Sequence, residues 1–176
     1  MEKAYDQVEW DFLFDALHKF GFHPKWIELI KPYISTVLYY VIVNENVWGF
    51  FTPTRAISQG DLLSPYPFII CMELLTWMLQ KTAFRQKCGI GVKISPKASK
   101  FSCLLFADDS LLFCRTNLES FYELSYILHN LCHNSRQLIN FHKSSLTFSS
   151  NAYAYDKQIV SSIFNITHQD NLGQVS

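Results

Sequence analysis

The sequence predicts an α+β fold in a single domain, with helices and strands sharing one hydrophobic core. The chain has 176 residues, of which 49% are hydrophobic and 17% charged, so it can bury a sizeable core. Aromatic residues reach 16%, which favours a mixed core over a plain helix bundle. Runs with the helical spacing of apolar residues and hairpin-like runs both occur, and no linker divides the chain.

The first part of the sequence predicts two helices. Apolar residues recur on one helical face over residues 8–20, and Gly21 stands where a C-terminal cap belongs. Asp6 precedes this helix and is expected to cap it. A second helical pattern covers residues 24–34 and has a proline in its first turn. Pro32 lies inside this pattern, where we expect it to end or kink the helix because proline lacks an N–H.

The middle of the chain predicts a hairpin followed by a buried helix. Residues 36–43 are β-branched and aromatic, and a polar turn at residues 44–46 leads into a second apolar run. Residues 52–64 are expected to form a loop. A Ser-Pro pair then begins a helix over residues 65–81. Residues 88–100 are rich in glycine, lysine and proline, which indicates a surface connection.

The last part of the chain has the clearest hairpin pattern, at residues 101–115. An amphipathic helix is expected over residues 118–131, with its cap in the pair Thr116-Asn117. A short strand near residues 146–148 and a final helix near residues 155–164 complete the predicted elements.

The charge of the chain bears on nucleic-acid binding. The formal net charge is +0 at pH 7, whereas nucleic-acid-binding domains usually carry a basic excess that neutralises phosphates. If the protein handles nucleic acid, most of the basic surface must therefore lie outside this chain.

The cysteines and the N-terminal residues indicate a soluble, intracellular protein. The 5 cysteines are scattered without a C-x-x-C pair, which indicates reduced thiols rather than a zinc site or a disulfide framework. Glu2 and Lys3 stand where a signal peptide would need apolar residues. The longest apolar stretch, residues 68–79, contains Glu73 and is too short to span a bilayer, so no membrane partner is expected.

Two adjacent aspartates, Asp108 and Asp109, lie at the tip of the last hairpin. Rigid apolar arms would hold both carboxylates still, and two-metal phosphoryl transfer needs such groups because Mg²⁺ prefers hard oxygen ligands. The alternative is an ordinary turn, where aspartate is common because it bonds to nearby backbone. Read alone, the segment favours the turn only slightly, since acids near a core are costly without a cation.

Three other segments could carry chemistry, although the plainer alternatives are a loop, a helix cap and a surface charge. Gln59 can bond a base or sugar, and Gly60 permits a close approach of the backbone to a ligand; the alternative is a loop before a helix. Tyr5 stands just before the first helix. Lys143 precedes a predicted strand, where a lone lysine is usually a solvated surface charge.

In this order and spacing, these segments resemble the palm of the reverse transcriptases of non-LTR retrotransposons, particularly the LINE type abundant in plants. The opening KAYDQVEW looks like motif A of that family and QGDLLSPYPF like motif B. LLFADDSLLF matches motif C, and SRQLINFHKSS resembles the segment around motif D. The closing NLG looks like the beginning of a short stretch that follows the palm. Four ordered motifs over most of the chain make the resemblance highly specific.

The resemblance implies a polymerase palm of the α+β class, in which a small antiparallel sheet carries the Asp108-Asp109 hairpin and helices pack on one face. It implies RNA-directed DNA synthesis from an RNA template, a DNA primer and deoxynucleoside triphosphates. Asp108 and Asp109 would bind two Mg²⁺ ions, which activate the primer 3′-hydroxyl and steady the pyrophosphate leaving group.

The other motif residues acquire roles by the same resemblance. Gln59 and Gly60 would lie along the incoming nucleotide and the template. Tyr5 occupies the place of the bulky residue that excludes a ribose 2′-hydroxyl. Lys143 stands where a motif D lysine helps to protonate the leaving group.

Motif A departs from the family pattern at its catalytic residue. The family's aspartate stands five residues before the tyrosine, and counting back from Tyr5 places it just before Met1. Asp6 cannot replace it, because one step along a strand turns a side chain to the opposite face. Glu2 also stands at the wrong spacing. We therefore expect the chain to be inactive alone, as a fragment or a decayed copy of a retrotransposon polyprotein.

Further departures replace glycines and change motif B. Arg136 stands where the motif D segment has a glycine, and the turn at residues 44–46 replaces an expected Asn-Gly. In motif B, the family's glycine, arginine, proline and leucine are replaced by Ala56, Ser58, Leu62 and Pro67.

By resemblance, residues 1–150 form a partial palm with most of the fingers missing, and residues 151–176 begin the connection toward a missing thumb. These missing parts would account for the neutral charge. A missing strand before Met1 would leave a sheet edge unpaired and the domain marginally stable. Two alternatives remain: an active polymerase that has another carboxylate, and a non-catalytic palm-fold scaffold that binds RNA or protein.

Overall fold

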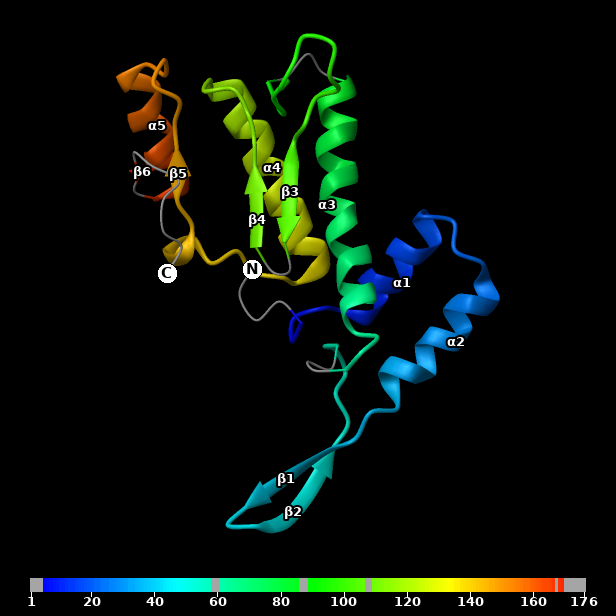
Figure 1. Cartoon of the computed structure of the whole chain (residues 1–176). Helices are drawn as coiled ribbons and strands as arrows, with labels where there is room; N and C mark the ends of the chain where they lie inside the picture. The colour runs from blue at the N-terminus through cyan, green and yellow to red at the C-terminus, as the bar shows by residue number, and fades with distance from the viewer. Residues whose placement is uncertain (1–4, 58–60, 86–88, 107–108, 167, 170–176) are drawn as a thin grey trace. The chain divides into compact units, whose positions relative to one another are not determined.

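The computed structural model describes residues 5–57, 61–85, 89–106, 109–166 and 168–169 (Figure 1). These residues form five α-helices, one 3-10 helix and six short strands, which confirms the expected α+β class. The chain divides into two compact units. We call them the N-terminal unit (Lys3–Leu74 and Cys132–Leu138) and the C-terminal unit (Met1–Glu2, Leu75–Leu131 and Ile139–Ser176). Each is described by itself.

Helix α1 (Trp10–Lys19) opens the N-terminal unit. Its buried residues, Leu13, Ala16 and Leu17, share one face, as the apolar spacing predicts. The expected C-terminal cap is confirmed, since Gly21 has a φ of 79°. The expected capping role of Asp6 is wrong, because the helix begins later in the chain and Glu9 is its N-cap residue, with no side-chain capping bond.

Helix α2 (Pro24–Ser35) continues past Pro32 to Ser35, so this proline does not end it. Proline has no N–H, so one backbone hydrogen bond of the helix is lost, but Thr36 supplies two donors at the end of the helix. The Pro32 carbonyl accepts from the backbone N of Thr36 at 3.0 Å and from its Oγ1 at 2.6 Å. A proline near the last turn is therefore tolerated here.

Strands β1 (Tyr39–Val43) and β2 (Asn46–Phe51) form the predicted first hairpin. Asn44 and Glu45 both have positive φ, 49° and 65°, as a type I′ hairpin turn requires. The rings of Tyr39 and Phe51 stack across the strands, with centroids 5.4 Å apart. Nearly every side chain of both strands is exposed, on both faces of this ribbon.

Helix α3 (Pro65–Arg85) begins at the predicted Ser-Pro pair and extends a turn beyond its expected end. Pro67 lies in its first turn, where a missing N–H costs no helical bond. In the N-terminal unit, the helix buries several large side chains, namely Phe68, Cys71, Met72 and Leu74.

Strands β3 (Cys103–Phe106) and β4 (Asp109–Leu112) form the second predicted hairpin, in the C-terminal unit. Leu104 pairs with Leu111 and Phe106 with Asp109, so these four share one face, which is exposed. On the other face, the Sγ atom of Cys103 lies 3.4 Å from Thr76 Oγ1 of α3. Helical cover on one face agrees with the expectation from the sequence.

The segment before this hairpin corrects the expectation of a surface connection over residues 88–100. Ile90 is fully buried and forms an isolated bridge with Cys114. The amide of Gly89 donates to Ser120 Oγ at 3.0 Å, and a Cβ on Gly89 would meet that oxygen at 2.4 Å. The glycine that indicated a loop therefore permits a close backbone approach, while most of the remaining segment is exposed.

Helix α4 (Leu118–Ser135) has the predicted cap, since Asn117 Oδ1 accepts from the backbone N of Ser120 at 2.9 Å. The helix runs a turn further than expected. Helix α5 (Ala154–Phe164) buries Val160, and its last residue meets Phe121 edge to face at 6.1 Å.

The remaining elements of the C-terminal unit are short: η1 (Phe141–Lys143), β5 (Leu146–Thr147) and β6 (His168–Gln169). Strand β5 appears at the predicted place and pairs with β6 in parallel. Among the described residues, no helix has both the length and the apolar character that crossing a membrane requires.

Candidate functional site

Tyr5 lies in a turn before α1, in the N-terminal unit, and its side chain is half-buried. Its ring stacks on Phe68 of α3, with centroids 4.7 Å apart and an interplanar angle of 21°. Phe68 is itself 1% exposed, so this contact fixes the tyrosine ring against the body of the unit. Stacking of this kind stabilises a defined ring orientation beyond the area that it buries.

The backbone around Tyr5 is bound to the segment that precedes Gln59 and Gly60. The Tyr5 carbonyl accepts from the amide of Ile57 at 3.0 Å, and the Val8 carbonyl accepts from the amide of Ala56 at 2.9 Å. The indole Nε1 of Trp10 donates to the Ala56 carbonyl at 2.8 Å. Gln59 and Gly60 themselves lie outside the described residues. The structure therefore brings Tyr5 beside the chain that leads into them.

The chain that leaves Gly60 is also anchored, by Asp61. Its Oδ2 accepts a hydrogen bond from the hydroxyl of Tyr33, and its Oδ1 accepts from the amide of Leu63 at 3.1 Å. The Tyr33 hydrogen bond, followed by that of Leu63, holds the pKa of Asp61 below its usual value. The same hydrogen bond raises the pKa of Tyr33 to about 12.

The sequence interpretation missed this pair. Tyr33 and Asp61 stand 28 residues apart, on α2 and before α3, and no periodicity links them. The only local signal was the position of Asp61 shortly before a helix start, where an aspartate commonly bonds the following backbone amides.

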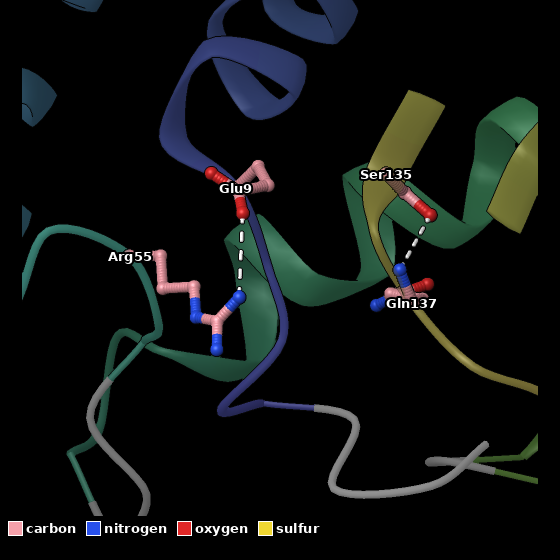
Figure 2. A network of polar contacts seen from close by, with 4 residues as sticks. All are labelled: Glu9, Arg55, Ser135 and Gln137. Atoms are coloured by element: carbon pink, nitrogen blue, oxygen red, sulfur yellow. Dashed lines mark hydrogen bonds and ion pairs between the residues drawn. The ribbon is translucent and has the colours of Figure 1, made fainter. Parts of the chain in front are cut away.

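A polar hollow of about 400 Å³ lies elsewhere in the N-terminal unit. Figure 2 shows two of its lining residues, Glu9 and Arg55, whose Oε1 and Nη1 atoms lie 3.6 Å apart. The same view shows the hydrogen bond that the backbone N–H of Gln137 donates to Ser135 Oγ, with a length of 3.2 Å. The hollow is lined by Glu9, Asp11, Phe12, Arg55, Asn134 and Arg136. Its two arginines and two acids offset one another, so it has no excess of charge with which to attract an ionic ligand.

Asp109 is the first residue of β4 in the C-terminal unit, and its side chain is exposed. It pairs across the hairpin with Phe106, which is 83% exposed, so both lie on the face opposite to the Thr76 contact. Asp108 lies outside the described residues. The hairpin thus presents one described carboxylate to solvent, at the tip of two paired strands.

Lys143 ends η1, and its side chain is exposed. Its backbone amide donates to Asn140 Oδ1 at 3.2 Å, which fixes the turn ahead of β5. No contact between Lys143 and the hairpin carboxylate is present among the described residues of the C-terminal unit.

The described residues supply only part of a metal site. Among the described positions, no group of three or more histidine, cysteine, aspartate or glutamate side chains could hold an ion. Asp109 is a hard oxygen donor of the kind that Mg²⁺ takes, but it supplies only part of such a set. The chemistry of the hairpin therefore fits a divalent cation, and the described ligand set is incomplete.

Comparison with known proteins gives the family. The family described as "Reverse transcriptase (RNA-dependent DNA polymerase)" matches residues 1–169. An uncharacterized mitochondrial protein of Arabidopsis thaliana is 38% identical over 69 residues, which cover 39% of this chain and 56% of that protein. The match thus spans about half the length of this curated relative. Enzymes of the matched family bind nucleic-acid templates and use divalent metal ions. Because the family match covers nearly the whole sequence, the chain belongs to the reverse transcriptases, the RNA-dependent DNA polymerases.

Proposed function

We propose that this chain is the palm portion of a reverse transcriptase from a non-LTR retrotransposon of the LINE type. The observation that carries the proposal is the placement of Tyr5. Its ring rests on Phe68, and its carbonyl binds the amide of Ile57, just before Gln59. This arrangement supports a nucleotide site in which a fixed tyrosine ring stands beside the segment that meets the incoming nucleotide.

The proposed chemistry is nucleotidyl transfer at the tip of the β3–β4 hairpin. Asp108 and Asp109 would hold two Mg²⁺ ions there. When bound, such ions activate an attacking hydroxyl and stabilise a phosphate leaving group. The exposure of Asp109 suits a ligand that must be reached by a primer end and a triphosphate.

The remaining residues have proposed roles in binding. Tyr5 would exclude a ribose 2′-hydroxyl, because a ring held by stacking cannot move aside for it. Gln59 and Gly60 would contact the incoming deoxynucleotide and the template. Lys143, exposed at the end of η1, would protonate the leaving pyrophosphate.

The proposed partners are an RNA template, a DNA primer and deoxynucleoside triphosphates. The formal net charge of +0 predicts weak binding to the duplex by this chain alone, because phosphate contacts supply most of such affinity. We propose that nucleotide incorporation needs an aspartate five residues before Tyr5 in addition to Asp108 and Asp109, because two-metal catalysis depends on a full set of ligands in fixed geometry.

The test is primer extension on an RNA template with Mg²⁺. The 176-residue chain is compared with a version extended at its N-terminus by an apolar strand that ends in an aspartate directly before Met1. Its matched control ends in asparagine at the same position. We expect incorporation by the aspartate version alone, and its loss in Asp109→Asn.

Other results would change the conclusion. If the unextended chain incorporates nucleotides, and Asp108→Asn abolishes that incorporation, the proposed need for an aspartate before Tyr5 is overturned. Specific binding of RNA or of a protein, without incorporation by any version, would favour the non-catalytic scaffold.

A further inference from the structure

We propose that a hollow lined by α3 and α4 in the C-terminal unit binds an alkylated ammonium group, such as that of choline or of a trimethylated lysine side chain. The site is separate from the proposed nucleotidyl transfer and gives the chain a second ligand. Its basis is a hollow lined by two aromatic rings and a carboxylate, with a cation of the protein itself held over one of the rings.

The hollow has a volume of about 260 Å³, and its lining belongs entirely to the C-terminal unit. Residues three and four apart share one side of a helix, so each helix turns a continuous strip of side chains toward the hollow. The lining includes Trp77, Met78 and Lys81 from α3, and Glu123, Tyr126 and Ile127 from α4.

The Trp77 ring already holds a cation in this structure. Lys81 stands four residues later on α3, and its Nζ atom lies 4.3 Å from the centre of the ring. Tryptophan is the best aromatic partner for a cation, because the face of its ring is the negative part of a quadrupole. Tyr126 gives the hollow a second ring of this kind, and it is 65% exposed, so a ligand can reach it.

Glu123 supplies a formal negative charge in the same hollow. Its side chain is half-buried, and among the described residues its carboxylate takes part in no ion pair. The nearest candidate, Lys81, has its ammonium over Trp77 instead. A partly buried charge is screened less by water and salt than an exposed one, so it attracts a cation more strongly. A cationic ligand therefore meets ring faces and an opposite charge together.

The apolar part of the lining selects the kind of cation. Met78 is half-buried and Ile127 is 3% exposed, so thioether and aliphatic surface lies beside the rings. A primary ammonium is compact and strongly hydrated, whereas an alkylated one presents methyl groups to such surface and is the ligand that aromatic cages bind. A phosphate backbone is disfavoured, because one lysine and one glutamate give the lining no basic excess.

The hollow lies on the side of α3 that faces away from the β3–β4 hairpin. Thr76 of α3 contacts Cys103 of that hairpin. At about 100° per residue, the α3 residues that line the hollow are centred on the opposite side of the helix from Thr76. A ligand in the hollow would therefore leave the Asp109 carboxylate uncovered, and its binding can be measured whether or not the chain incorporates nucleotides.

The experiment titrates the full chain with choline and follows the indole N–H signal of Trp77 by NMR, which is assigned by its absence in Trp77→Phe. The control ligand is the neutral analogue in which carbon replaces the choline nitrogen. We expect a saturable shift with choline and about tenfold weaker binding of the analogue, which has the same shape but no charge. Equal binding of the two ligands, or a choline shift that does not saturate, overturns the proposal.

Two charge variants should change the affinity in opposite directions. Lys81→Met removes the cation that competes for the Trp77 ring, so we expect choline to bind about fivefold more tightly. Its matched control is Lys157→Met, which removes a lysine that lies 5.9 Å from the centre of the Phe148 ring and should leave the affinity unchanged. Glu123→Gln should weaken binding about fivefold. Unchanged affinity in both Lys81→Met and Glu123→Gln overturns the proposal.

A further pair of variants tests the second ring, and a second ligand identifies the source of the cation. Tyr126→Leu should weaken choline binding about fivefold, whereas Tyr122→Leu, at a 60% exposed position of the same helix, should not. Calorimetric titration with choline and with a blocked trimethyllysine compares the two sources. Tighter binding of choline assigns the site to a free headgroup, and tighter binding of trimethyllysine assigns it to a side chain of a partner protein. Binding of neither overturns the proposal.

Discussion

At three described positions, the backbone adopts the left-handed conformation with a residue that disfavours it. Glu45, Ala56 and Arg136 have φ values of 65°, 84° and 58°. An L-residue other than asparagine or aspartate is strained there by roughly 1–2 kcal/mol, because its Cβ crowds the following carbonyl. Ala56 and Arg136 stand where the resemblance expects glycine, and Glu45 lies in the turn that replaces an expected Asn-Gly. At all three positions the backbone adopts a conformation that glycine tolerates best.

Restoring one of these glycines should stabilise the protein. We expect Ala56→Gly to raise the free energy of unfolding by about 1 kcal/mol, because strain at positive φ outweighs the extra entropy of glycine in the unfolded chain. Urea denaturation measures the change. The control is Ala83→Gly inside α3, where the same substitution should lower the free energy of unfolding by about 0.5–1 kcal/mol. A loss of stability in both variants would contradict the strain at residue 56.

The contact between Tyr33 and Asp61 predicts a pH dependence. The pKa of Asp61 is lowered in the folded state, so its contribution is fully present above the ordinary value of 3.8 and is lost as pH falls through the folded value. The pKa of Tyr33 is raised from 10.0 to about 12, so that contribution is fully present below pH 10.0 and is lost as pH rises toward 12.

The stability difference between the unaltered chain and Tyr33→Phe should therefore be constant from about pH 4 to pH 10 and should shrink on either side. Urea denaturation across this range measures it. A difference that changes between pH 5 and pH 9 would show that another titrating group dominates the contact.

At the scale of elements, local patterns predicted most helices and both hairpins. The turn at Asn44 and the cap at Asn117 are interactions between near neighbours in sequence, and the sequence contains all that they need. Helix α2 continues past Pro32, and the Pro32 carbonyl accepts hydrogen bonds from both the backbone N and the Oγ1 of Thr36. A general rule about proline does not include such bonds. Asp6 lies too far upstream to cap α1, because the helix begins only after Glu9.

Contacts between distant segments explain what the sequence could not predict. Gly89 meets Ser120, and Ile90 forms an isolated bridge with Cys114, so part of a segment with loop composition is buried and paired. The motifs gave Tyr5 and Asp109 as candidate site residues, but they gave no sign of the contact between Tyr33 and Asp61. Side chains that meet across many residues leave no periodic trace.

The close approach at Gly89 supplies a prediction at this scale. A Cβ there would lie 2.4 Å from Ser120 Oγ and 2.7 Å from Arg115 Cβ. We expect Gly89→Ala to lower the free energy of unfolding by about 1–3 kcal/mol, because the neighbouring segments must move apart. Chemical denaturation measures this loss, and unchanged stability would mean that the segment is not held against α4.

At the scale of the whole molecule, the chain exposes many large apolar side chains. Both faces of the β1–β2 ribbon and one face of the β3–β4 hairpin are uncovered, and an isolated two-stranded hairpin is only marginally stable in water. Among the described residues, the largest fully buried side chains come from a few helical faces, with Val8, Ile90 and Gln137 as the exceptions. Burial on this limited scale leaves little net free energy of folding.

We therefore expect the isolated chain to melt below about 45 °C, the lower end of the usual range for mesophilic domains. Circular dichroism at 222 nm would follow the transition, with a deoxynucleoside triphosphate and Mg²⁺ added in a parallel sample. A cooperative transition above about 65 °C would contradict the marginal stability, since it would require more burial than the exposed sheet faces allow.

The three left-handed positions also have a consequence at the level of the gene. In the genetic code, every glycine codon lies a single base from an alanine codon and from an arginine codon, and the purine-ending ones lie a single base from glutamate. Glu45, Ala56 and Arg136 can each have arisen from glycine by one point mutation, and one reversal restores each. A single base change could therefore relieve the strain at each of these sites, so the three glycine variants are short mutational routes to a more stable chain.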